Sequence, residues 1–212
     1  MKTEVYLLDI SAYEDNLVKE EYDKISSHFI STDAEKLSMR KESLLGKILL
    51  CRTLERCGVK EFQVHYKDGE KPQLLGGDNL FFNISHSGNF VMVALSDSDV
   101  GCDIQEIRPY NPKVAKRNYC PEERLLIEDS EDKDDVFIKL WALKESVLKQ
   151  TGKGISGGLA TYNFSAFAEK ESFSAYGYNF FVKKIHNAYS AVCHKAQELK
   201  IQTVDEEYVK GE

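Results

Sequence analysis

Two long helical patterns, each followed by several short strand patterns, constrain the fold of this chain more than any other feature. In the first, leucine and isoleucine recur every three or four residues, the period of a helix with one buried face. We expect this helix to span residues 34–57 and to end at Gly58. The second pattern predicts a helix over residues 135–151, which ends at the glycine-rich segment 152–158.

After the first helix, Phe62, Val64 and Tyr66 alternate with polar residues, as a half-buried strand does. We expect strands in 62–66, 80–85, 90–95, 100–105, 161–167, 172–178, 179–185 and 188–193. A long helix thus precedes several strands in each half, which predicts an α+β fold. Because no local motif recurs, this order fits an internal duplication and a chance recurrence equally well.

Charge and cysteine content exclude several classes of protein. The net charge of −7 argues against non-specific nucleic-acid binding, since most of that affinity comes from neutralised phosphates. An anionic ligand would therefore need a local basic cluster or a metal. The five cysteines include no Cys-x-x-Cys pair, so neither a disulfide framework nor a structural zinc site is indicated. No apolar run is long enough to span a membrane, and we expect a cytoplasmic protein.

The second helix carries a candidate functional face. Trp141, Glu145 and Lys149 are spaced four residues apart, so they line one side of the helix. The simpler alternative is an ordinary exposed Glu–Lys pair, which stabilises a helix by only a few tenths of a kcal/mol.

Polar residues also mark two of the predicted strands. Asp103 and Gln105 face the same way on the strand 100–105, and an ionised Asp103 among apolar neighbours needs a metal or a basic partner. A turn-closing aspartate is the alternative. The segment Ser85-His86-Ser87-Gly88 ends another strand and could cradle an anion with its backbone N–H groups, or His86 could simply be satisfied by local backbone.

Four motifs, taken in order, resemble the 4′-phosphopantetheinyl transferases of the subclass typified by the surfactin-synthetase activator. The motifs are Glu70-Lys71-Pro72, Asn83-Ile84-Ser85-His86-Ser87-Gly88, Gly101-Cys102-Asp103-Ile104-Gln105 and Trp141-x-x-Lys144-Glu145-Ser146-x-x-Lys149. Their order and spacing match the family over residues 1–160, and four such matches across about 80 residues are improbable by chance.

The resemblance implies a fold and an activity. It implies a pseudo-dimer of two similar α+β halves, each a long helix packed on a small, mostly antiparallel sheet, with the active site at their interface. We expect the halves at residues 1–106 and 107–212, the second ending in an acidic tail that is mobile at its end. The implied reaction is Mg²⁺-dependent transfer of 4′-phosphopantetheine from coenzyme A to a serine of an apo acyl or peptidyl carrier protein, with release of 3′,5′-ADP.

The resemblance also implies roles for single residues. Asp103 and Glu145 match the metal-binding carboxylates, and Gln105 stands where many relatives carry a further acidic ligand, so it would bind the metal directly or through water. Mg²⁺ is the expected ion, with Mn²⁺ as an alternative. Glu145 or a metal-bound water would accept the serine proton, and Lys149 would neutralise the departing phosphate.

Further residues match the coenzyme A site. Lys149 would support the phosphates, and Lys144 would support the phosphates or the loop around them, while Lys71, Ser85 and His86 would hold the 3′-phosphate and adenosine end. Glu42 stands where relatives usually have a basic residue, and Lys36 or Arg40 would substitute for it.

Two rival functions and one docking surface complete the predictions. A non-catalytic coenzyme A-binding relative or partner subunit would bind without transfer, and a metal-dependent phosphohydrolase would need no carrier. The basic residues after the Asp103 strand would dock the acidic carrier, or form only a solvated loop: Arg108, Lys113, Lys116 and Arg117. We expect a monomer.

Overall fold

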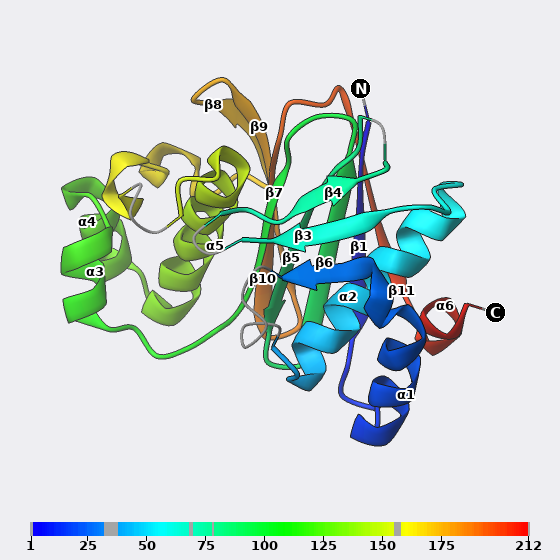
Figure 1. Cartoon of the computed structure of the whole chain (residues 1–212). Helices are drawn as coiled ribbons and strands as arrows, with labels where there is room; N and C mark the ends of the chain where they lie inside the picture. Colours follow the sequence, from blue (N-terminus) through cyan, green and yellow to red (C-terminus); the bar gives the residue numbers. More distant parts are fainter. Residues whose placement is uncertain (1, 32–37, 68–69, 78, 155–157, 212) are drawn as a thin grey trace. The chain divides into compact units, whose positions relative to one another are not determined.

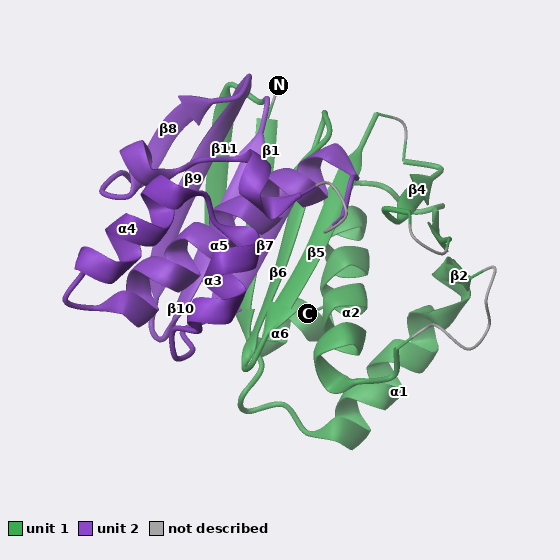
Figure 2. Cartoon of the chain, turned by 90° about the vertical axis from the view of Figure 1, so that its left-hand side faces the viewer, with its two compact units in different colours: residues 1–100, 196–212 green, residues 101–195 purple. Residues whose placement is uncertain are grey.

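The computed structural model describes residues 2–31, 38–67, 70–77, 79–154 and 158–211. The chain divides into two compact units, drawn in Figures 1 and 2. Unit 1 comprises residues 1–100 and 196–212, and unit 2 comprises residues 101–195. Each unit combines helices with a sheet, which confirms the α+β class.

Unit 1 is built on a four-stranded sheet in the order β11-β1-β6-β5. Its strands are β1 (Lys2–Asp9), β5 (Phe81–Ser87), β6 (Phe90–Ser96) and β11 (Glu198–Val204). All neighbours pair antiparallel except β1 and β11, which are parallel. A small second sheet holds β2 (Phe29–Ser31), β3 (Gln63–Tyr66) and β4 (Gln73–Leu75).

The helices of unit 1 are α1 (Asp15–Ile25), α2 (Lys41–Arg56) and α6 (Glu206–Lys210), with a 3₁₀ turn at Ser26–His28. The long helix α2 contacts β5 and β6 through a fully buried apolar stripe that includes Leu45, Ile48 and Leu49. Gly46 allows this close approach, because a Cβ there would lie 2.8 Å from Ile84 Cγ2. The helix begins later than predicted, and residues 32–37 lie outside the described part of the chain.

Unit 2 contains an antiparallel sheet in the order β7-β10-β9-β8. The strands are β7 (Gly101–Glu106), β8 (Ser172–Ala175), β9 (Tyr178–Ile185) and β10 (Ala188–His194). The helices are α3 (Pro112–Asn118), α4 (Pro121–Asp129) and α5 (Lys133–Thr151), with 3₁₀ turns at Leu159–Thr161 and Ser165–Phe167. Helix α5 packs on β7 and β10.

Local signals explain where α5 begins and ends. The Asp132 side chain accepts a hydrogen bond from the Asp135 backbone N–H at 3.0 Å, which caps the first turn. Gly152 ends the helix with φ of +68°, a left-handed conformation that glycine adopts without strain. The predicted helix over 135–151 therefore differs from the observed one by two residues at its start.

The division of the chain differs from the predicted halves 1–106 and 107–212. Strand β7 belongs to unit 2 because it pairs with β10, and the segment from Ala196 onward belongs to unit 1 because β11 pairs with β1. The segment expected to be an acidic tail contains regular secondary structure up to Lys210. There β11 is followed by α6, whose Val209 is 2% exposed.

The strand predicted for residues 161–167 is wrong. The Asn163 side chain accepts hydrogen bonds from the backbone N–H of Ser165 at 3.0 Å and from its hydroxyl at 2.8 Å. This side-chain bond turns the chain, and the alternating aromatic residues Tyr162 and Phe164 lie between two 3₁₀ turns.

Across the described ranges, no helix has both the length and the apolar character needed to cross a membrane.

Candidate functional site

Strand β7 and helix α5 meet in unit 2 at Gly101. A Cβ on Gly101 would lie 2.0 Å from the Ser146 carbonyl oxygen and 2.3 Å from the Gln150 backbone nitrogen. No larger residue fits without moving the helix or the strand. Because strand side chains alternate, Asp103 lies on the same face of β7 as Gly101 and is directed toward α5.

The carboxylate of Asp103 forms an ion pair with α5. Lys149 Nζ lies 2.6 Å from Asp103 Oδ1, and Asp103 is only 4% exposed. Burial alone would lower the pKa of Lys149, but the Asp103 carboxylate, together with Cys102 and Glu145, raises it above its ordinary value. The lysine is therefore held as an ammonium ion.

Glu145 precedes Lys149 by one helical turn on the same face. Burial raises the pKa of Glu145, the Asp103 carboxylate raises it further, and Lys149 opposes the shift only in part. Its Oε1 atom is buried and makes no hydrogen bond to any described residue. The predicted trio of Asp103, Glu145 and Lys149 is thus brought together by two elements of one unit.

The donor set suits a hard divalent cation. Two carboxylates lie close enough to influence each other, and the buried Glu145 oxygen lacks a hydrogen-bond donor among the described residues. No three His, Cys, Asp or Glu side chains gather as a metal cluster in those same residues. Mg²⁺ accepts such a sparse set, because it usually keeps several waters. Asp103 and Glu145 therefore fit the predicted metal.

Gln105 follows Asp103 on the same face of β7 and lines a cavity of about 330 Å³ in unit 2. Its other lining residues are Arg108, Pro109, Asn111, Val114, Phe137, Ile138 and Trp141. The amide oxygen of Gln105 can act as a neutral ligand, while the other side chains that line the cavity are mostly apolar and include one arginine.

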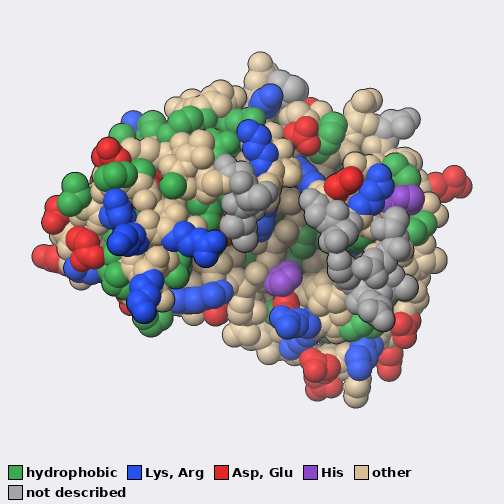
Figure 3. Space-filling model, turned by 60° about the vertical axis from the view of Figure 1, so that its left-hand side comes forward, with side chains coloured by type: hydrophobic (Ala, Val, Ile, Leu, Met, Phe, Trp, Pro, Cys, Tyr) green, Lys and Arg blue, Asp and Glu red, His purple; other side chains and the backbone are tan. Residues whose placement is uncertain are grey.

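The basic residues after β7 are all exposed. Arg108 precedes α3, while Lys113, Lys116 and Arg117 lie on it. Figure 3 shows several lysine and arginine side chains on one face of the molecule. These residues are accessible to a partner, as the docking prediction requires.

Lys71 lies in unit 1. Its Nζ donates a hydrogen bond to the Val100 carbonyl oxygen at 2.7 Å and lies 3.6 Å from Asp99 Oδ1. Lys71, Asp99 and Pro72 line a cavity of about 370 Å³ together with β4 and the start of β5. The structure therefore places the predicted lysine at a pocket of unit 1.

Ser85 and His86 both belong to β5, where Ser85 pairs with Met92 and His86 with Val91. The strand ends at Ser87, and a turn at residues 88–89 follows it. Because side chains alternate, the two residues lie on opposite faces of the sheet. Ser85 is buried, whereas His86 lines a second cavity of about 180 Å³.

This second cavity contains Lys47, which the sequence analysis missed. The other lining residues are Ser43, Tyr66, Pro72, Phe82, Asn83 and Ile84. Lys47 is 2% exposed and donates to the Ser38 carbonyl oxygen at 3.1 Å, and its Nζ lies 5.1 Å from the centre of the Tyr22 ring. Burial lowers its pKa to about 8. Lys47 could have been recognised in the sequence as a lysine among the apolar residues of α2.

Of the two proposed substitutes for the missing basic residue, Lys36 lies outside the described residues. Arg40 is exposed at the N-cap of α2.

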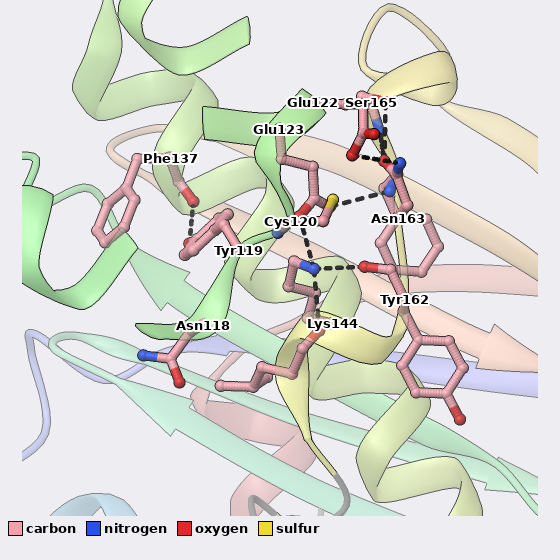
Figure 4. A network of polar contacts seen from close by, with 12 residues as sticks. Asn118, Tyr119, Cys120, Glu122, Glu123, Phe137, Lys144, Tyr162, Asn163 and Ser165 are labelled. Carbon is pink, nitrogen blue, oxygen red and sulfur yellow. Dashed lines mark hydrogen bonds and ion pairs between the residues drawn. The ribbon is translucent and has the colours of Figure 1, made fainter. Parts of the chain in front are cut away.

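Lys144 occupies a different environment from the predicted phosphate site. It is 0% exposed, and its ammonium bonds to Glu123 and to the carbonyl oxygens of Leu159 and Tyr162 (Figure 4). These three partners use all three N–H donors of a lysine. No donor is left for a phosphate, so a direct phosphate contact by Lys144 is excluded in this arrangement.

Comparisons with known proteins agree with the motifs. The sequence profile of the 4′-phosphopantetheinyl transferase superfamily matches residues 99–208, which include Asp103, Glu145 and Lys149. The chain is 39% identical over 130 residues to a putative 4′-phosphopantetheinyl transferase, slr0495, of Synechocystis sp., covering 58% of this chain and 51% of that protein.

Two Bacillus subtilis proteins are also similar. The chain is 32% identical over 126 residues to the 4′-phosphopantetheinyl transferase Sfp, covering 57% of this chain and 56% of Sfp. It is 32% identical over 159 residues to the 4′-phosphopantetheinyl transferase ffp, covering 69% of this chain and 70% of ffp. The match thus spans about half the length of slr0495 and Sfp. The profile match and the ffp relationship confirm the resemblance: the chain belongs to the 4′-phosphopantetheinyl transferase superfamily.

Proposed function

We propose that this protein transfers 4′-phosphopantetheine from coenzyme A to a serine hydroxyl of an apo carrier protein and releases 3′,5′-ADP. The observation that carries the proposal is the trio of buried Asp103 with half-buried Glu145 and Lys149, which lies within the segment matched by the family profile. Membership of the superfamily supports the same reaction class.

Asp103 and Glu145 would hold Mg²⁺, and Gln105 would contribute its amide oxygen or orient a water. When bound, the cation would withdraw charge from the pyrophosphate oxygens of coenzyme A. With one neutral ligand in place of a carboxylate, we expect the protein to bind Mg²⁺ more weakly than a site with three acidic ligands would.

Glu145 would accept a proton, and Lys149 would stabilise negative charge on the leaving group. The raised pKa of Glu145 makes its carboxylate more basic, so it can accept the proton of the serine hydroxyl. The serine oxygen forms the new bond to the β-phosphorus, and the bond to the bridging oxygen breaks with its electron pair moving to 3′,5′-ADP. The Lys149 ammonium, held by Asp103, would stabilise that developing negative charge.

Residues of unit 1 would bind the nucleotide end of coenzyme A. Lys71 and Lys47 supply ammonium groups at two cavities, and His86 and Tyr66 supply rings beside Lys47. An ammonium among rings suits a ligand that joins an aromatic base to a phosphate. Lys47 takes the place that the sequence analysis gave to Lys36 and Arg40.

A non-catalytic coenzyme A-binding relative is the second candidate, and Gln105 favours it because it removes an acidic ligand. Intact-mass analysis of an apo carrier protein incubated with this protein, coenzyme A and Mg²⁺ separates the two. A gain of one phosphopantetheine is expected from the wild type and from Glu131→Ala, an exposed control in unit 2, but not from Glu145→Ala or without metal. Bound coenzyme A without a mass gain on several carriers would identify the non-catalytic relative.

A further inference from the structure

A fully buried ion pair lies directly beside the proposed catalytic face of α5. Lys144 Nζ lies 2.7 Å from Glu123 Oε2, and both side chains are 0% exposed. Lys144 also donates to the Leu159 carbonyl oxygen at 2.9 Å and to the Tyr162 carbonyl oxygen, and its Nζ lies 5.4 Å from the centre of the Tyr119 ring. The Lys144 side chain is thus surrounded by protein and is not exposed to solvent.

Glu123 is equally engaged. Its Oε1 accepts the backbone N–H of Phe164 at 2.9 Å, and its Oε2 accepts the backbone N–H of Cys120 at 3.1 Å (Figure 4). The second bond closes the first turn of α4. The Glu123–Lys144 pair therefore joins three parts of unit 2: the start of α4, the middle of α5 and the segment 159–164.

The segment 159–164 follows α5 in the sequence, after the glycine-rich residues 152–158. Lys144 is adjacent in sequence to Glu145, and it precedes Lys149 by five residues of the same helix. Two backbone carbonyls and one amide of the segment 159–164 bond to the pair. Because a buried charge pair with satisfied hydrogen bonds permits few alternative geometries, it fixes the rotation of α5 at this point.

We infer that Glu123 and Lys144 are positioning residues for the transfer reaction: the pair sets the orientation of Glu145 and Lys149 by anchoring the segment 159–164 to α5. The inference rests on the proposed function. Of the two roles expected of Lys144, it sets aside the direct phosphate contact and develops the support of a neighbouring segment. Since a displacement of about 1 Å in a catalytic group can reduce a rate by about a hundredfold, loss of the pair should reduce kcat.

The principal test is the double variant Glu123→Leu/Lys144→Met, which replaces both charges with apolar side chains of similar size so that neither is left unpaired. We expect kcat for carrier modification to fall about 10- to 100-fold, while KM for coenzyme A changes less than about threefold. Hydrogen exchange of the Phe164 amide should become at least about tenfold faster, because its acceptor is gone.

Two further variants sharpen the test. Glu123→Gln keeps the size of the side chain and an acceptor for Phe164, so it should fold and lose less kcat than the double variant. Lys133→Met is the matched control: Lys133 Nζ pairs with Glu128 Oε2 at 2.6 Å between the same two helices, but both side chains are exposed. It should leave kcat and the exchange of Phe164 unchanged.

Each outcome decides something. A wild-type kcat in the double variant, or a fall in rate that only mirrors the loss of folded protein, would overturn the positioning role.

If the wild type modifies no carrier, the proposed function fails, and with it a positioning role in that reaction. The exchange of Phe164 would still show whether the pair anchors the segment 159–164. If the double variant does not fold, a wild-type kcat in Glu123→Gln together with faster Phe164 exchange would contradict the inference.

Discussion

Lys149 Nζ lies 2.6 Å from Asp103 Oδ1, while Glu145, one turn earlier on the same helix, keeps a buried oxygen without a hydrogen bond to any described residue. The Lys149 ammonium therefore forms its ion pair with Asp103, one of the two neighbouring carboxylates. The pKa of Glu145 is raised by burial and by the like charge of Asp103.

This unequal sharing predicts opposite effects for two amide substitutions. Glu145→Gln removes a half-buried charge whose Oε1 atom makes no hydrogen bond to a described residue, so we expect a higher thermal midpoint at pH 7 in metal-free buffer and a fall in kcat of about 10²- to 10⁴-fold. Asp103→Asn leaves the Lys149 ammonium without its main partner and should lower the free energy of unfolding by about 1–3 kcal/mol. Calorimetry with EDTA and carrier-modification kinetics measure both effects, and a destabilised Glu145→Gln variant would contradict this account.

Gly101 is the second testable feature of this site. In Gly101→Ala the new methyl group meets backbone atoms of Ser146 and Gln150, which cannot rotate away, so we expect a loss of about 1–3 kcal/mol or more in denaturant unfolding. Gly46→Ala is the matched control, because its Cβ would meet side-chain atoms and no backbone, Ile84 Cγ2 at 2.8 Å and Val91 Cγ1 at 3.7 Å. An equal loss in both variants would show that the approach of β7 to α5 is not specially tight.

Local patterns predicted much of the fold and part of the site. The helical periods located the α5 helix within two residues, and the spacing of Glu145 and Lys149 placed them on one face. The pairing of Asp103 with Lys149 also lay within reach, because a buried strand carboxylate needs a basic partner.

The remaining features depend on contacts that a local pattern does not encode. Strand β11 looks like a polar tail until it pairs with β1, nearly the whole chain length away. Lys144 and Lys47 look like available cations, because the sequence does not reveal that the first pairs with Glu123 and that the second is enclosed by rings. The turn at Asn163 resembles a strand because its aromatic residues alternate.

Gln105 should limit the affinity for metal. Gln105→Glu adds a third carboxylate oxygen donor to Asp103 and Glu145, so we expect the Mg²⁺ concentration that supports half-maximal transfer to fall about tenfold, which corresponds to about 1.4 kcal/mol. A Mg²⁺ titration of the initial rate measures this change. An unaltered Mg²⁺ requirement would remove Gln105 from the neighbourhood of the ion.

Lys47 should make coenzyme A binding depend on pH. Its ammonium loses its proton as the pH rises through about 8, so the affinity of wild type should be higher at pH 7 than at pH 9. The 3′-dephospho analogue of coenzyme A is the control ligand, and Lys47→Met should remove most of the pH dependence. Calorimetric titration at both pH values measures it, and an unchanged pH dependence in Lys47→Met would place the phosphate elsewhere.

The same shift predicts a change in stability. The pKa of Lys47 is lowered in the folded state, so between about 8 and its ordinary value of 10.5 the unfolded chain binds more protons. The contribution of Lys47 to the free energy of unfolding therefore rises with pH across that window and is least favourable below pH 8. Lys47→Met should accordingly be more stable than wild type at pH 7, by a margin that narrows towards pH 10.

The exposed basic residues on α3 give the last prediction. A carrier protein that is acidic around its modified serine would be attracted by Lys116 and Arg117, since complementary charge mainly increases the rate of association. Lys116→Glu/Arg117→Glu should raise KM for the carrier about tenfold or more at low salt and leave the Kd for coenzyme A unchanged. Lys19→Glu, an exposed substitution in unit 1, is the control and should alter neither constant. If KM for the carrier and Kd for coenzyme A rose equally in the α3 variant, misfolding would be indicated. If neither constant changed, these residues would form only a solvated basic surface.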